Sequence, residues 1–225
     1  MTDPSLPPTR RIGIFLFEGF EPLDVWGFTE AFTIARFLGK TYFDAGPHPF
    51  EVRFIAKEVK AVRSDNGPQA MPDYDIARAR QEHFDVLMMP GGSGTRPLLN
   101  DREVLDFLTF MEPRVGIMAS VCTGAALLAK LGLLDGLPAA TNHEAFEWVA
   151  SQGPRVLWDN VSRWVDAGHY VTSAGVSAGT DMAFHLVSRL AGRAVAEGAV
   201  QRAEYDWHRD PGEPIHDPRQ ARVRR

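Results

Sequence analysis

The sequence contains one cysteine, Cys122, among its 225 residues. A lone cysteine excludes a disulfide framework within the chain and is compatible with the reducing cytosol. The sequence also lacks the H-E-x-x-H pattern and any Cys/His cluster with the spacing of a zinc site. We therefore expect a protein that works without a metal and without another cofactor.

Long apolar runs and an excess of basic residues are missing as well. No apolar run approaches the ~18 residues of a membrane-spanning helix. Residues 1–10, with three prolines, contain no apolar segment like that of a signal peptide. The 24 Lys and Arg residues are outnumbered by 29 Asp and Glu, and the net charge of −5 disfavours a broad basic face for nucleic acid. We expect a cytoplasmic protein that binds a small-molecule substrate, and neither membranes nor nucleic acid.

Short apolar segments alternate along the chain with segments of helical periodicity. Buried strands are predicted at residues 12–17, 85–89 and 115–121, and helices at residues 23–38, 97–111 and 177–190. Such alternation indicates a mostly parallel sheet covered by helices on both faces. We therefore predict a flavodoxin-like, doubly wound α/β fold.

The remaining segments add detail to this fold without adding a second domain. A turn at Gly168 between two short apolar stretches predicts a small β-hairpin. No internal repeat or linker divides the chain. We expect one domain over residues 11–208, between a disordered lead-in at residues 1–10 and a polar tail at residues 209–225.

Cys122 lies at a change of periodicity in the sequence. Residues 115–121 are apolar and predict a strand, whereas residues 123–131 favour a helix that ends at Gly132. The cysteine therefore falls on a strand-turn-helix elbow, where the free N–H groups of the helix favour an anion. A thiol in such a place is expected to ionise near neutral pH, with a pKa of about 3.5–7.5. The alternative is a small, inert, buried side chain.

Three loops are expected to meet near Cys122, because the carboxyl ends of parallel strands share one edge of the sheet. They are the loop after residues 12–17, the loop of Gly91, Gly92 and Ser93, and the turn of Cys122 itself. The glycines allow backbone amides to approach a ligand, so the Gly92 N–H is a candidate donor to an anionic intermediate. A plain tight turn remains an alternative, whereas the G-x-G-x-x-G spacing of a dinucleotide loop is absent.

Polar side chains from three further segments are candidates for the same site. Asp24 either caps the helix that follows the first strand or shares a proton with the Cys122 sulfur as a coupled pair. His143 follows a short strand and is a possible base for the thiol. Ser177 opens a helix, where capping explains it and a place in the pocket is also possible.

Taken together, four segments resemble the ThiJ/PfpI superfamily, whose fold is like that of class I glutamine amidotransferases. The matching segments are residues 14–24, 89–94, 120–124 and 172–182. Their order along the chain is that of the family, and they most resemble its isonitrile hydratase branch. Thr123 stands where the peptidase-like branch has histidine, and no late H-x-E element of a glutaminase is present.

The resemblance implies roles for several residues. Cys122 would be the nucleophile and Asp24 the acid hydrogen-bonded to it, while the amides of Gly92 and Thr123, in a pocket with Gly91 and Ser93, would stabilise an anionic intermediate. The expected reaction is hydration of a small C–N substrate to an N-substituted formamide by a homodimer.

Two alternative functions remain open in the sequence. A glyoxalase-like or amidase-like hydrolase would use the same thiol on a carbonyl compound, with His143 as the base. A redox-responsive protein without a dedicated substrate would use the thiol as a target of oxidation.

Overall fold

A seven-stranded sheet forms the centre of the protein in the computed structural model, which describes residues 6–213 and 215. In spatial order, its strands are β10 (Trp164–Ala167), β11 (Tyr170–Ser173), β7 (Ile117–Val121), β6 (Val86–Met89), β1 (Arg10–Phe15), β2 (Phe50–Ala56) and β5 (Tyr74–Asp75). Neighbouring strands are parallel except β10 and β11, which form the predicted antiparallel hairpin around Gly168. Two small sheets pair β3 (Val62–Arg63) with β4 (Gln69–Ala70) and β8 (Pro138–Ala140) with β9 (Leu157–Asp159).

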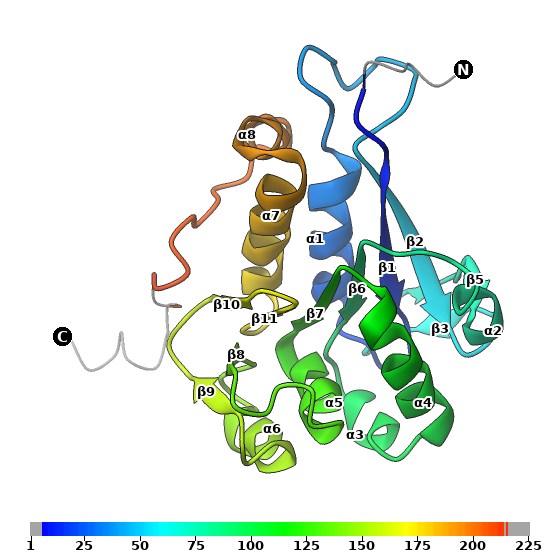
Figure 1. The fold of residues 1–225 in the computed structure, drawn as a ribbon, viewed down its shortest axis with the longest axis vertical. Helices are drawn as coiled ribbons and strands as arrows, with labels where there is room; N and C mark the ends of the chain where they lie inside the picture. The colour runs from blue at the N-terminus through cyan, green and yellow to red at the C-terminus, as the bar shows by residue number, and fades with distance from the viewer. Residues whose placement is uncertain (1–5, 214, 216–225) are drawn as a thin grey trace.

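Helices cover both faces of this sheet, so the predicted doubly wound α/β fold is confirmed (Figure 1). They are α1 (Pro22–Thr33), α2 (Ile76–Ala79), α3 (Thr95–Leu98), α4 (Arg102–Met111), α5 (Ala125–Lys130), α6 (Phe146–Gln152), α7 (Ser177–Ala191) and α8 (Arg193–Arg202). Helices α1 and α7 pack side by side on one face, and α4 lies on the opposite face (Figure 1).

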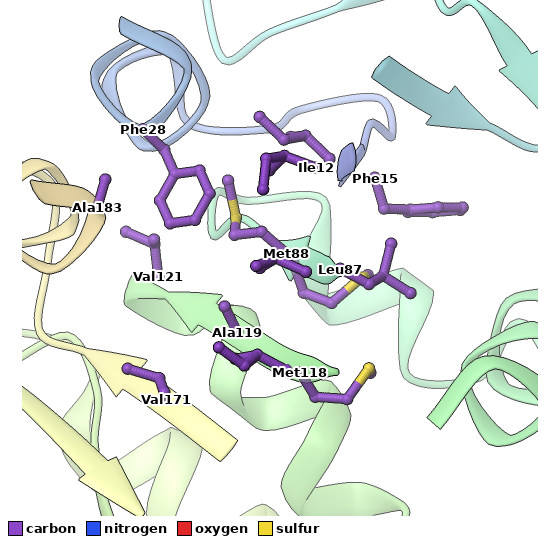
Figure 2. Close-up of a cluster of buried hydrophobic side chains, with 14 of the residues drawn as sticks. Ile12, Phe15, Phe28, Leu87, Met88, Met118, Ala119, Val121, Val171 and Ala183 are labelled. Atoms are coloured by element: carbon purple, nitrogen blue, oxygen red, sulfur yellow. The ribbon is translucent and has the colours of Figure 1, made fainter. Parts of the chain in front are cut away.

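The central strands are buried on both faces, as their unbroken apolar sequences predict. All four residues of β6 and all five of β7 are buried. Figure 2 shows Phe28 of α1 and Ala183 of α7 beside the sheet residue Val121. On the opposite face, the ring of Phe15 lies 5.6 Å from that of Phe107 in α4. The packed core fixes the carboxyl ends of β1, β6 and β7, from which the candidate site is built.

The structure divides the helix expected at residues 97–111 into α3 and α4. The Asp101 carboxylate accepts hydrogen bonds from the backbone N–H groups of Glu103 at 3.1 Å and Val104 at 3.4 Å. Asp101 is therefore the N-cap of a new helix. Because α3 and α4 both carry apolar residues, periodicity alone does not separate them.

The segment after α8 is held against α7 by a buried carboxylate. Asp181 is fully buried and accepts hydrogen bonds from Arg163 Nε at 2.9 Å, the Tyr205 hydroxyl at 3.1 Å and the His208 N–H at 3.1 Å. Residues 1–5, 214 and 216–225 lie outside the described part of the chain, so the boundaries expected for the lead-in and the tail stay predictions. Within the described part, no helix has the length and apolar character needed to cross a membrane.

Candidate functional site

The loops after β1, β6 and β7 meet at one edge of the sheet, as their parallel arrangement predicts. The Gly91 N–H, after β6, donates a hydrogen bond of 2.7 Å to Oδ2 of Asp24, near the start of α1. A Cβ atom placed on Gly91 would lie only 2.7 Å from the Cβ of Cys122. Gly91 thus contacts both the carboxyl group and the residue that carries the thiol.

Cys122 sits on a strained turn between β7 and α5. Its φ of +57° lies in the left-handed region, which costs a residue with a side chain about 1–3 kcal/mol. Two hydrogen bonds fix this turn: the Cys122 N–H donates to the Ala174 carbonyl at 3.3 Å, and the Thr141 hydroxyl donates to the Cys122 carbonyl at 2.8 Å. The predicted strand-turn-helix elbow is present and aims its cysteine away from the regular path of the strand.

Glycines give this elbow the space that it needs. A Cβ on Gly91 would lie 2.7 Å from the Thr123 N, and one on Gly124 would lie 2.2 Å from the Met89 carbonyl oxygen. Because backbone atoms occupy these positions, a methyl group at either residue must displace the turn.

Substitution of Gly91 by alanine is therefore expected to lower the free energy of unfolding by about 1–3 kcal/mol. Gly198→Ala is the matched control, since a Cβ there meets only the movable guanidinium of Arg202, 3.1 Å away. In helix α8 this control should be neutral or stabilising by up to about 1 kcal/mol. Urea denaturation of both variants measures the difference. Equal stability of the two variants would contradict the close contact at Gly91.

Asp24 is fully buried beside the elbow and does not cap α1, so the capping interpretation is wrong. Its Oδ2 accepts the Gly91 N–H, whereas Oδ1 has no hydrogen-bond partner among the described residues. The Val176 amide lies near enough to lower the Asp24 pKa slightly without completing a hydrogen bond to Oδ1. Burial dominates and raises the pKa of Asp24 well above its ordinary value, against the opposing effect of the Gly91 hydrogen bond. The environment favours a neutral carboxylic acid.

The Cys122 thiol is less acidic than the sequence predicts. Only 6% of the residue is exposed, and burial is the largest cause that raises its pKa; the negative charge of Asp24 raises it further. Hydrogen bonds from the Thr123 N–H and the Asn142 side chain lower it, but do not outweigh burial. The expectation of a thiol that ionises independently near neutral pH is therefore corrected. Ionisation of the sulfur is favoured where Asp24 holds its proton, so the two groups titrate as a pair.

A cavity of about 680 Å³ opens over the sulfur. Its wall includes the carboxylates of Glu21, Asp65 and Glu144, together with Trp148 and Arg96. The Arg96 guanidinium lies 4.0 Å from the centre of the Trp148 ring, in a cation–π contact. With three carboxylates and one guanidinium, this wall carries an excess of negative charge.

The backbone amides of the loop of Gly91, Gly92 and Ser93 hydrogen-bond to other groups of the protein. The Gly92 N–H donates to the Thr123 hydroxyl at 3.1 Å, and the Ser93 N–H donates to Asp65 at 2.7 Å. Gly92, Ser93 and Thr123 all line the cavity, whereas the Gly91 amide is occupied by Asp24. Their roles in stabilising an intermediate stay predictions, and the Thr123 N–H lowers the pKa of the Cys122 thiol.

The structure places two of the sequence candidates outside the cavity. His143 does not line it; its charge acts on Asp159 and lowers the pKa of that carboxyl group. Ser177 is exposed at the start of α7 and lines a separate groove with Leu23 of α1. The roles suggested for His143 and Ser177 at the sulfur stay predictions.

The sequence analysis missed Asn142, which lines the cavity and whose side chain lowers the pKa of the Cys122 thiol. The only signal was its place two residues after the end of strand β8, next to His143. Asp65, in a turn, and Arg96, in the four-residue helix α3, were also missed, because a charged residue in so short a segment has no distinguishing pattern. Among the residues that the structure describes, no group of three His, Cys, Asp or Glu side chains could hold a metal ion.

The fold and the site define an α/β protein with a cysteine on a strand-turn-helix elbow and a buried carboxyl group beside it. The chain belongs to the DJ-1/PfpI family, whose sequence pattern matches residues 10–189. The resemblance to the ThiJ/PfpI superfamily is thereby confirmed. A crystal structure of a ThiJ/PfpI family protein from Pseudomonas syringae superposes with a TM-score of 0.79 at 26% identity, covering 96% of this chain and 84% of that one.

Relatives of known name differ in what they do. Isonitrile hydratase of Pseudomonas putida is 29% identical over 87% of this chain and 78% of its own length. The HTH-type transcriptional regulator GbdR of Pseudomonas aeruginosa is 26% identical over 90% of this chain, which spans 54% of the regulator. The glutathione-independent glyoxalase DJR-1.2 of Caenorhabditis elegans is 22% identical over 63% of this chain and 74% of its own length. The family therefore contains enzymes and regulators.

Proposed function

We propose that this protein is an enzyme that hydrates small isonitriles to N-substituted formamides, with Cys122 as the nucleophile and Asp24 as the proton donor. The observation that carries the proposal is the fully buried Asp24 carboxyl group, whose pKa is raised beside a cysteine on an elbow. Addition of a thiol to an electron-rich carbon requires an acid that stays protonated at neutral pH.

The reaction begins with one proton shared between Cys122 and Asp24. The anionic sulfur forms a bond to the terminal carbon of the isonitrile, and the Asp24 proton passes to that carbon, giving a thioimidate. Water then adds to the C=N carbon and the nitrogen gains a proton. The C–S bond breaks, the formamide leaves, and the shared proton returns to the Cys122–Asp24 pair. The sum is one isonitrile plus one water to one formamide.

The charge of the cavity restricts the substrates that fit this proposal. Glu21, Asp65 and Glu144 face the cavity with only Arg96 as a counter-charge, so a carboxylate on the substrate is repelled. Trp148 offers an aromatic wall to the apolar substituent of an isonitrile. We expect neutral or cationic isonitriles to react, and their carboxylate-bearing analogues to react poorly.

The alternatives receive less support. A glyoxalase-like or amidase-like reaction needs a base, and His143 lies outside the cavity. A redox role needs a thiolate in the resting protein, and the raised pKa of Cys122 limits that form.

To test the proposal, the protein is incubated separately with a neutral isonitrile, its carboxylate-bearing analogue, an α-oxoaldehyde and hydrogen peroxide. The products are identified by nuclear magnetic resonance, and the oxidation state of Cys122 by mass spectrometry. We expect formamide from the neutral isonitrile and little from the carboxylate analogue. Conversion of the α-oxoaldehyde with inert isonitriles would instead support the glyoxalase-like alternative. Stoichiometric oxidation of Cys122 without turnover of any compound would support the redox alternative.

A further inference from the structure

We propose that the side-chain amide of Asn142 is a fixed hydrogen-bond donor to the Cys122 sulfur, in the place that a histidine holds in a Cys-His pair. Its part in turnover rests on the proposed function, but its contact with the sulfur does not. Asn142 and Cys122 line the same cavity, whereas the neighbouring His143 does not.

The orientation of the Asn142 amide follows from its other contact. Its Oδ1 accepts a hydrogen bond of 2.9 Å from the N–H of Ala145. A backbone N–H can only donate, so the oxygen of the amide must face Ala145, and the NH₂ group occupies the other end. That NH₂ group can only donate, and the Cys122 sulfur, as a thiolate, can only accept.

Two further contacts fix the position of this NH₂ group. A Cβ atom on Gly175 would lie 2.4 Å from Nδ2 of Asn142, so the absence of a side chain at Gly175 provides the space for the amide. The hydroxyl of Thr141, the preceding residue, donates to the Cys122 carbonyl at 2.8 Å. The segment that carries the amide is therefore tied directly to the nucleophile residue.

A hydrogen-bond donor at the sulfur opposes the effects that disfavour a thiolate in this site. Burial and the charges of Asp24 and Glu21 disfavour an anion on Cys122, and the opposing effects come from the Thr123 N–H and the Asn142 side chain. Unlike an imidazole, a carboxamide neither loses nor gains a proton in the working pH range. Asn142 can therefore stabilise a thiolate without acting as a base, which leaves Asp24 as the group that exchanges the proton.

Titration of the Cys122 thiolate in the resting protein tests this role. The ultraviolet absorbance of the thiolate is followed against pH in the wild type, Asn142→Ala, Asn142→Asp and the control His143→Ala. We expect a rise in the thiol pKa of about one unit or more in Asn142→Ala, since a hydrogen bond to a charged group is lost. His143→Ala should titrate as the wild type.

Asn142→Asp separates this role from that of a structural contact. Aspartate keeps an oxygen for the Ala145 N–H but replaces the donor at the sulfur by a negative charge. We expect a larger rise in the thiol pKa than in Asn142→Ala, with the melting temperature close to that of the wild type. If Asn142→Ala fails to fold, Asn142→Asp decides alone.

The outcomes separate this inference from the proposed function. If the Cys122 thiol of both Asn142 variants titrates at the same pH as that of the wild type, the inference is overturned, even if isonitriles are hydrated at full rate. Raised thiol pKa values in a protein that hydrates no isonitrile sustain the role of Asn142 and refute the proposed function. A rise in His143→Ala equal to that in Asn142→Ala would also overturn the inference, because the histidine would then be the group that acts on the sulfur.

Discussion

Replacement of Cys122 by serine is expected to lower the proposed turnover of isonitriles by about a thousandfold or more. Serine has nearly the same volume, but its hydroxyl group is far less acidic than a thiol and is a poor nucleophile without a strong base. The turn should keep its shape, because the hydrogen bonds that fix it involve only the backbone atoms of residue 122. Formation of formamide at saturating substrate measures the loss.

Ser177→Ala is the matched control for this substitution. Ser177 is exposed and lies in the groove beside α1 rather than in the cavity, so its loss should leave turnover unchanged. Hydration at the wild-type rate by a well-folded Cys122→Ser protein would refute covalent catalysis through the sulfur.

Replacement of Asp24 by asparagine is expected to lower turnover by about 10²–10⁴-fold, the usual contribution of a positioned general acid. Asparagine has the same shape and can still accept the Gly91 N–H through its carbonyl oxygen, but it has no proton to give. The measurement is the rate of formamide formation against pH. A rate within a factor of a few of the wild type would contradict the role of Asp24 as proton donor.

The same variant should also change how stability depends on pH. Burial raises the Asp24 pKa above its unfolded value near 3.8, so the folded protein binds this proton more tightly than the unfolded chain. The stability that the proton contributes is fully present below the unfolded pKa and is lost as pH rises through the folded one. Each unit of difference corresponds to about 1.4 kcal/mol at higher pH. As the pH rises from the unfolded to the folded pKa of Asp24, the melting temperature should therefore fall less steeply in Asp24→Asn than in the wild type.

The fold and the meeting of the three loops were predictable from the sequence, because their signals are local. The unbroken apolar sequences of β6 and β7 specify central strands, and parallel strands bring their carboxyl ends to one edge. The abrupt change from strand to helix at Cys122 specified the elbow. Whether its sulfur is ionised depends instead on burial by distant segments and on Asp24, which local sequence does not reveal.

The choice of His143 rather than Asn142 as a candidate has a related cause. Both residues lie beyond the three-residue strand β8, Asn142 in irregular backbone and His143 in a bend. So short a strand gives no periodicity from which to infer which of the two faces the cavity. The choice was made by residue type, whereas it is Asn142 that lines the cavity.

The central claim is that the buried carboxyl group of Asp24 and the sulfur of Cys122 share one proton. Titration of the thiol in the wild type and in Asp24→Asn tests this most directly, because no substrate is needed. Since the Asp24 charge raises the Cys122 pKa, we expect the thiol of the variant to ionise at lower pH than that of the wild type. Identical titration curves for the two proteins would show that the carboxyl group and the sulfur do not interact, and would contradict the claim.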